Sequence, residues 1–174
     1  MSTPVQAQVE QRAQALAALF GHIASTRMAG IPILHPALRV QAVGFEAETA
    51  PDGTPRACAG VLITPWFMNL VRLPLADDEP MAGVGVTARR QVGALAFDFI
   101  GANEPGFGRW EACSLFSPMG DFADHAAALA TAEAVLAELR RPPDVVETSP
   151  STPQQRPSRR ALLFGREAGA GTPR

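Results

Sequence analysis

Lysine is absent from this sequence of 174 residues: all 15 basic residues are arginines, and 17 acidic residues bring the formal net charge to -2. We attribute the missing lysine to a general bias in composition rather than to function. Proteins that bind nucleic acid concentrate basic side chains to neutralise phosphates. The sequence has no such excess, so we expect no nucleic-acid partner.

Long apolar runs are also missing. A helix that crosses a bilayer needs about 20 consecutive apolar residues, and no stretch of the sequence approaches that length. Residues 1–14 have neither the basic start nor the apolar centre of a secretory signal. We therefore expect no membrane insertion and a cytoplasmic location.

Residues that bind metals are scarce. Only two cysteines occur, Cys58 and Cys113, and a reducing compartment favours buried thiols over a disulfide between them. Zinc and iron sites need ligands at short, regular spacings. The histidines stand alone, at His22, His35 and His125. We expect neither a metal nor a cofactor, and we expect His22 and His125 to be polar residues on helix faces.

Two segments have the apolar spacing of a helix. The first follows Thr3, a capping residue, and ends before Gly30; the second runs from Asp121 to Arg141, where two prolines follow. Its expected buried stripe includes Phe122, Ala126, Leu129, Leu136 and Leu139. Between the helices we predict strands at residues 38–42, 57–63, 66–73, 84–88, 94–99 and 110–116.

This order of elements predicts an α+β fold. We expect a mainly antiparallel sheet of four to six strands with the N- and C-terminal helices packed on one of its faces. The composition changes after Pro143, where Pro, Ser, Thr, Gln and Arg replace apolar residues. Such a segment buries too little apolar surface to offset the entropy of ordering. We therefore predict one domain, residues 1–143, and a disordered tail, residues 144–174.

Three segments have distinctive sequences: residues 27–38 (RMAGIPILHPAL), 64–70 (TPWFMNL) and 112–119 (ACSLFSPM). Their order and spacing resemble the HybE/HupJ family of accessory proteins in [NiFe]-hydrogenase maturation. The similarity runs from about residue 10 to residue 141. It is therefore far more specific than a single short motif.

Membership would imply a cytoplasmic chaperone rather than an enzyme. Its partners would be the [NiFe]-hydrogenase small-subunit precursor or its twin-arginine signal peptide, and/or the large subunit, together with other hydrogenase maturation proteins. The family has no established catalytic residues to assign here. Some relatives carry a rubredoxin-type iron domain, but its four spaced cysteines are missing from this sequence, so we expect no iron.

A chaperone that receives an arginine-bearing signal needs an apolar groove with carboxylates beside it. Residues 66–73 have large apolar side chains on both faces, which is typical of a central strand or of one partly exposed for binding. For each aromatic residue the alternative is a place in the core. The expected apolar contacts are Trp66, Phe67, Met68, Leu70 and Trp110, and the expected carboxylates are Asp77, Asp78, Glu79, Glu104 and Glu111.

The tail contains residues 158–164 (SRRALLF), which are similar to the twin-arginine export consensus Ser-Arg-Arg-x-Phe-Leu-Lys. Leu162 and Phe164 depart from that consensus, and no apolar region follows, so the segment is not an export signal. Two interpretations remain. Arg159, Arg160 and Phe164 form a decoy that occupies the signal-binding groove, or the arginine pair is incidental.

Two other functions stay open. Cys113 fits a thiol-dependent enzyme or maturation factor, although the sequence offers no identifiable base, and a small buried strand residue is the simpler interpretation. The chain also fits a scaffold subunit that is retained in a hydrogenase complex.

Overall fold

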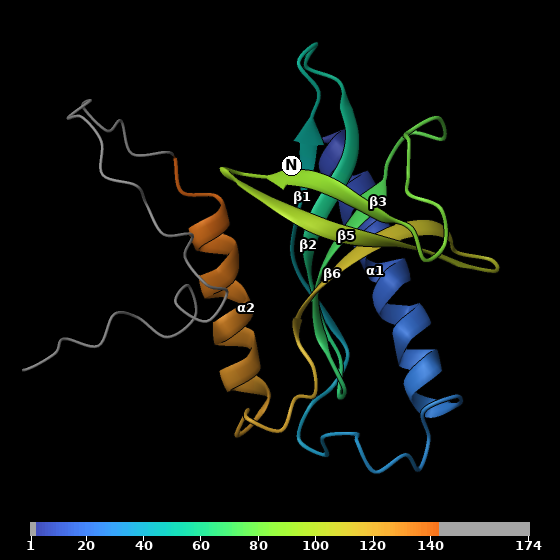
Figure 1. Cartoon of the computed structure of the whole chain (residues 1–174), viewed down its shortest axis with the longest axis vertical. Coiled ribbons are helices and arrows are strands. Elements are labelled where there is room, and N and C mark those ends of the chain that lie inside the picture. The colour runs from blue at the N-terminus through green and yellow to red at the C-terminus, as the bar shows by residue number, and fades with distance from the viewer. Residues whose placement is uncertain (1–2, 143–174) are drawn as a thin grey trace, which may run out of the picture. The chain divides into compact units, whose positions relative to one another are not determined.

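A computed structural model of the chain describes residues 3–142 (Figure 1). In this part of the chain a sheet of strands in the order β1-β2-β3-β6-β5-β4 lies between two helices, and every pair of neighbouring strands is antiparallel. The α+β prediction is confirmed. The elements are α1 (Pro4–Ser25), β1 (Gln41–Thr49), β2 (Pro55–Ile63), β3 (Met68–Pro74), β4 (Thr87–Val92), β5 (Leu95–Glu104), β6 (Gly108–Phe116) and α2 (His125–Leu139).

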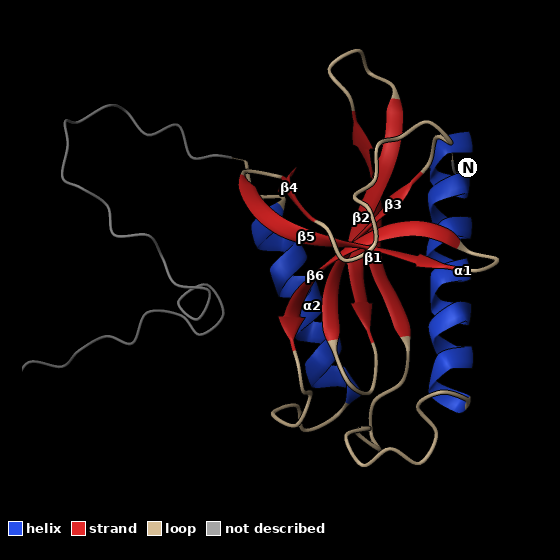
Figure 2. Cartoon of the chain, turned by 45° about the vertical axis from the view of Figure 1, so that its right-hand side comes forward, coloured by secondary structure: helices blue, strands red, loops and turns tan. Residues whose placement is uncertain are grey.

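The two helices cover opposite faces of the sheet (Figures 1 and 2), so the prediction that both pack on one face is wrong. Leu16 and Phe20 of α1 belong to a core cluster with Leu62 of β2, whereas Leu136 of α2 belongs to a second cluster with Val61. Successive side chains of a strand point to opposite faces. Because all but the first two residues of β2 are buried, both faces of this strand need a cover.

Capping side chains fix where each helix begins. Thr3 caps α1 as predicted, and its hydroxyl oxygen accepts a hydrogen bond from the Gln6 N–H at 3.2 Å. The predicted start of the second helix at Asp121 is wrong, because Asp124 is the capping residue and accepts from the Ala127 N–H at 2.9 Å. This start turns Ala126 outward, although the sequence placed it in the buried stripe.

A tight turn between β2 and β3 takes Trp66 and Phe67 out of the predicted strand. The Thr64 hydroxyl oxygen accepts hydrogen bonds from the N–H groups of Trp66 and Phe67, at 3.3 and 2.9 Å. Side-chain bonds of this kind favour a turn over an extended ladder. β3 therefore begins only at Met68.

The three segments that carry the family resemblance meet at one end of the sheet, at the bottom of Figure 1. His35, in the loop between α1 and β1, donates its N–H to the carbonyl oxygen of Pro65 in the β2–β3 turn at 2.8 Å. Its Nε2 bonds the carbonyl oxygen of Phe122, before α2, at 2.8 Å. Segments far apart in sequence thus form one structural unit.

Within residues 3–142, neither helix combines the length and the hydropathy that a membrane span requires.

Candidate functional site

The predicted apolar contacts do not share one surface. Met68 and Leu70 are fully buried in the cluster beneath α2, and Leu70 also lines the cavity between β1–β3 and the end of α2 that is described below. Trp66, Phe67 and Trp110 are half-buried on the other face, where they surround a phenylalanine of α1 at ring-centroid distances of 5.5 to 6.3 Å. These aromatic residues therefore close the core beneath α1.

The acidic residues lie apart from the aromatic turn. Trp66 and Phe67 precede β3 and residues 77–79 follow it, so the seven residues of β3 hold them about 20 Å apart. Trp110 and Glu111 point to opposite faces of β6, because side chains alternate along a strand. The structure thus does not join the predicted aromatic and acidic residues into one groove.

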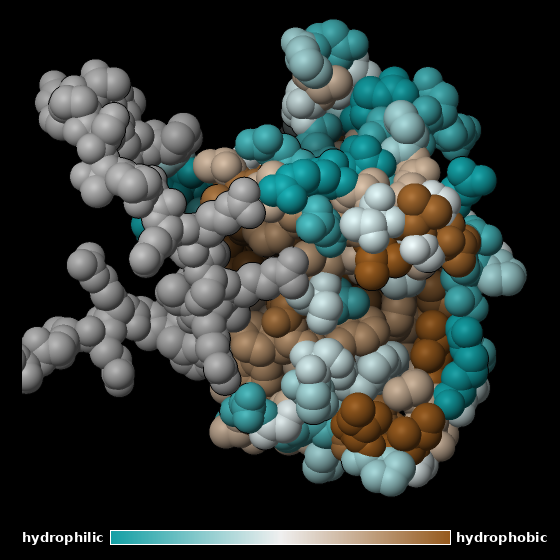
Figure 3. Space-filling model, in the orientation of Figure 1, coloured by the Kyte–Doolittle hydropathy of each residue, from teal (hydrophilic) through white to brown (hydrophobic). Residues whose placement is uncertain are grey.

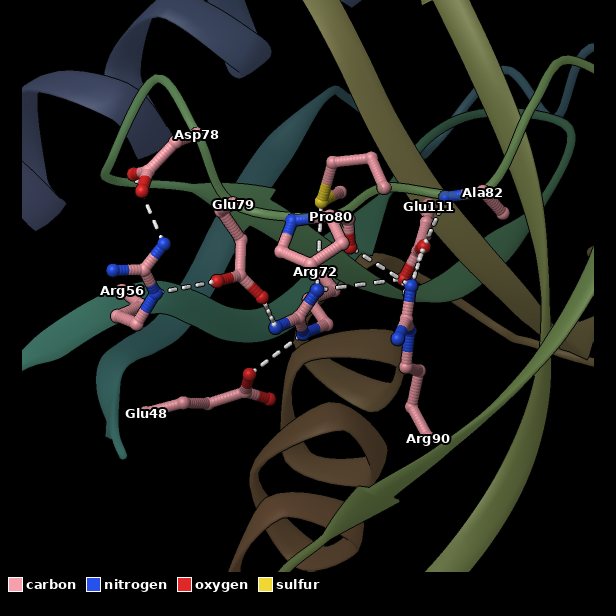
Figure 4. Close-up of polar contacts among 10 residues, drawn as sticks. Glu48, Arg56, Arg72, Asp78, Glu79, Pro80, Ala82, Arg90 and Glu111 are labelled. Carbon is pink, nitrogen blue, oxygen red and sulfur yellow. Dashed lines mark hydrogen bonds and ion pairs between the residues drawn. The ribbon is translucent and has the colours of Figure 1, made fainter. Parts of the chain in front are cut away.

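A row of alternating charges links the loop after β3 to the sheet (Figure 4), and we call it the ion-pair chain. Arg72 lies at its centre, bonding Glu79 on one side and approaching Glu111 to 3.6 Å on the other. Arg90 closes the row, with its Nε 2.9 Å from Glu111 Oε2. In order, the members are Asp78, Arg56, Glu79, Arg72, Glu111 and Arg90.

The carboxylates inside the ion-pair chain are ionised and already satisfied. Burial by itself raises the pKa of Glu111, but hydrogen bonds from Arg90 and from the Ala82 N–H, with the charges of Arg90 and Arg72, lower it overall. Burial likewise opposes the lowered pKa of Glu79, which Arg72 and Arg56 nevertheless hold below its ordinary value. Neither carboxylate is therefore available to a partner. Glu104, predicted as a contact, pairs with Arg27 at 2.6 Å.

Asp77 and Asp78 are exposed beside a cavity of about 440 Å³, which we call the loop cavity. Asp78 keeps 79% of its side chain exposed although it pairs with Arg56. The guanidinium of Arg12 lies over a phenylalanine ring on the far wall, 4.5 Å from its centroid. The loop cavity is lined by Gln8, Arg12, Pro74, Leu75, Ala76, Asp77, Glu79, Met81, Phe107, Gly108 and Arg109.

A second cavity, of about 450 Å³, lies between β1–β3 and the end of α2, and we call it the carboxylate cavity. Its walls include Glu46, Glu48 and Arg140, none of which the sequence singled out. One signal was present: Glu46 and Glu48 stand two residues apart, the spacing that puts both carboxylates on one face of a strand. Leu136 and Leu139 of α2 supply apolar walls.

Exposed apolar side chains fall into two groups among the described residues, over the α1–β1 loop and over the loop before β4 (Figure 3). Ile31 and Ile33 form the first group, and Val84, Val86 and Ile100 the second. Neither group was predicted from the sequence, because both depend on how loops cross the sheet.

The cysteines are buried on opposite faces of the sheet, and no disulfide joins them, as predicted. Burial raises the pKa of Cys58 to about 12. Cys113 is only 6% exposed in the cluster beneath α2, a poor position for a nucleophile. No group of three potential metal ligands is assembled within residues 3–142.

The environment of His125 also differs from the prediction. The sequence placed it on a polar helix face, but it is buried, and its two ring nitrogens bond the Arg39 N–H and the Gln41 side chain. Burial lowers its pKa. His125 therefore ties the start of α2 to β1.

The tail residues Arg159, Arg160 and Phe164, and the predicted tail itself, lie outside the described residues.

Comparisons with known proteins agree on one family. The family model described as "[NiFe]-hydrogenase assembly, chaperone, HybE" matches residues 11–165. Protein HoxT of Cupriavidus necator is 46% identical over 163 residues, which cover 89% of each chain. Hydrogenase expression/formation protein HupJ of Bradyrhizobium diazoefficiens is 46% identical over 132 residues, which cover 76% of this chain and 73% of HupJ.

The fold also matches a solved structure. The solution structure of HybE from Escherichia coli superimposes with a TM-score of 0.57 and 24% identity over 91% of both chains, which supports the fold. The family match extends over most of the sequence, and the two relatives share nearly half of their aligned residues with it. On these grounds the chain belongs to the HybE family of [NiFe]-hydrogenase assembly chaperones.

Proposed function

We propose that this chain is a cytoplasmic assembly chaperone that binds the precursor of the [NiFe]-hydrogenase small subunit, through its twin-arginine signal peptide, before export. The family supports a hydrogenase-related partner. The observation that carries the finer proposal is the loop cavity, which Asp77 lines, with the exposed Asp78 next to it in sequence. The buried Cys113 gives no support to a thiol-dependent enzyme.

The loop cavity offers the two kinds of contact that an arginine-bearing signal requires. Leu75, Met81 and Phe107 provide apolar surface, and Met and Phe side chains suit a site that adapts to its ligand. Asp77 and Asp78 offer charge-assisted hydrogen bonds to guanidinium groups. A volume of about 440 Å³ lies within the usual range for ligand pockets.

The charge of residues 1–142 favours a cationic partner. Residues 1–142 hold 10 of the 15 arginines and 14 of the 17 acidic residues, so their formal charge is -4. A net negative field raises the rate at which a positively charged segment arrives. The basic start of a twin-arginine signal has the complementary charge.

The test replaces only the exposed carboxylates, Asp77→Asn with Asp78→Asn, and keeps Glu79, which the ion-pair chain needs. Exposed pairs contribute about 0.2 to 1 kcal/mol each, so the loss of two pairs should lower affinity for the client signal peptide about two- to thirtyfold. Fluorescence or calorimetric titration measures the change. Asp121→Asn with Glu133→Gln removes the same charge at exposed positions that line neither cavity.

An equal loss of affinity in both double variants would show that the effect comes from net charge alone. Unchanged affinity in both would reject the loop cavity as the binding site. Affinity purification from hydrogenase-producing cells identifies the subunit. Recovery of the large subunit alone would overturn the small-subunit assignment. Retention of the chain in stoichiometric amounts in purified mature hydrogenase would favour a scaffold subunit instead.

A further inference from the structure

The α1–β1 loop and the β2–β3 turn meet at one end of the sheet, at the bottom of Figure 1, and neither carries an acidic or arginine side chain. Residues 28–38 and 57–71 contain no Asp, Glu or Arg. We call the surface formed by residues 28–38 and 64–67 the uncharged end. Two of its side chains are exposed isoleucines, Ile31 by 39% and Ile33 by 49%, in one of the two apolar groups of Figure 3.

The exposed isoleucines stand on a loop that hydrogen bonds hold in place. The N–H groups of Ile31 and Leu34 donate to the carbonyl oxygens of Met28 and Ile31, both at 3.2 Å. His35 ties the same loop to the β2–β3 turn and to the segment before α2. Pro32, between the two isoleucines, fixes a further backbone φ. A partner therefore meets apolar side chains on an ordered backbone, which lowers the entropic cost of binding.

The chemistry and the size of this surface limit the kind of partner. A charged group brought against it would lose water without gaining an ionic partner, which costs free energy. Two partly exposed isoleucines also present only a small fraction of the about 800 Å² that each partner of a stable protein interface buries. The surface is therefore too small for a second copy of the chain and suits a short apolar segment.

The uncharged end lies within reach of the loop cavity for one peptide. Arg12 of α1 lines the loop cavity, and the loop with the two isoleucines follows the end of α1 at Ser25. A helix rises about 1.5 Å per residue, so these places are about 20 Å apart along α1. An extended peptide covers that distance with about six residues. A signal peptide has its apolar region of about 7 to 15 residues after its basic start.

We propose that the uncharged end binds a short apolar segment of a client protein, with Ile31 and Ile33 as its contacts. In the proposed function this segment is the apolar region of the signal peptide, whose arginines reach the loop cavity. Neither isoleucine lines the loop cavity, so the two sites are separate. Only the identity of the segment rests on the proposed function, because an uncharged apolar peptide tests the surface by itself.

The probe is N-acetyl-Gly-Leu-Ala-Leu-Ala-Leu-Gly-amide, titrated into the ¹⁵N-labelled full chain. The matched ligand has serine in place of each leucine. The leucine peptide should shift the amide signals of residues 28–35 and 64–67. The serine peptide should bind about tenfold more weakly, because it has lost the apolar side chains whose burial drives binding.

Ile31→Ser with Ile33→Ser should weaken binding of the leucine peptide about fivefold, because the apolar contacts are lost. Ile31→Leu with Ile33→Leu should keep the affinity within about twofold, since exchanges that conserve apolar volume are tolerated best. Val84→Ser with Val86→Ser removes exposed apolar side chains from the other group and should leave the affinity unchanged. The two matched peptides keep the test valid if the Ile31 and Ile33 serine variant fails to fold.

Equal binding of the serine peptide, shifts confined to other residues, or unchanged affinity in the folded Ile31 and Ile33 serine variant would overturn the proposal. Self-association, or binding to phosphatidylcholine vesicles, that this variant abolishes would assign the surface to a second copy or to a membrane instead. Titration with the whole signal peptide separates the two sites. A loss in the serine variant without a loss in Asp77→Asn with Asp78→Asn would support the uncharged end and reject the loop cavity, and the reverse result would reject the uncharged end.

Discussion

For Glu111, the sequence predicts the strand that holds the residue but not the partners of its carboxylate. The sequence predicts a strand at residues 110–116, and that strand is present as β6. The expected role of Glu111 as a partner contact is not supported, because this carboxylate is fully buried and bonded within the domain. Its partners Arg72 and Arg90 come from β3 and β4, and no local pattern encodes contacts between distant strands.

Glu111→Gln should lower the free energy of unfolding at pH 7 by about 3 kcal/mol, because it leaves buried positive charge without its carboxylate. The folded pKa of Glu111 lies below its ordinary value of 4.5, so its stabilisation is complete above that pH and is lost as the pH falls through the folded pKa. Urea unfolding at pH 7 and between pH 3 and 5 should show a shallower acid loss in the variant. Exposed Glu133→Gln is the control, and a similar loss there would contradict the assignment.

At the scale of elements, the segment before β4 departs most from the sequence prediction. Residues 84–88 were expected to form a strand, but β4 begins at Thr87, and residues 82–86 cross β5 at Gly101. The Gly85 N–H donates to the Gly101 carbonyl oxygen, and the Gly101 N–H donates to that of Val86, both at 2.9 Å. A crossing at a glycine leaves no periodic signal.

Gly101→Ala should displace this crossing and lower the free energy of unfolding by about 1 to 3 kcal/mol, the usual cost of overpacking. A Cβ at Gly101 would lie 2.3 Å from the Gly83 carbonyl oxygen. Relieving this contact requires a shift of backbone, which costs more than the rotation of a side chain. Thermal unfolding measures the loss. Gly120→Ala, where a Cβ would meet nothing within 4 Å, should leave stability nearly unchanged. Equal stability of the two variants would contradict the close approach.

For the whole molecule, local signals predicted the elements and long-range contacts decided their arrangement. The Thr3 cap was predictable from the sequence because its chemistry lies within a few residues. The sequence did not predict which face of the sheet each helix covers. Both faces of β2 are buried, and α1 covers one of them while α2 covers the other.

Truncation after Pro142 should leave the fold intact. Both core clusters draw their residues from the chain up to Leu139, so the truncated domain keeps its complete described core. The thermal midpoint should move by less than about 5 °C, which corresponds to roughly 1 kcal/mol for a domain of this size. A larger drop would show that residues 143–174 contribute to the stability of the domain.

The ion-pair chain begins in water at Asp78 and includes the fully buried Glu111 near its other end, and this asymmetry sets the order in which the loop after β3 opens. At the outer end, the pair between Asp78 and Arg56 is exposed and contributes little. Near the buried Glu111, the Ala82 amide donates to that carboxylate at 2.6 Å, so its proton exchanges with solvent only when this hydrogen bond opens. The tip of the loop can thus refit around a ligand while its root stays bonded to Glu111.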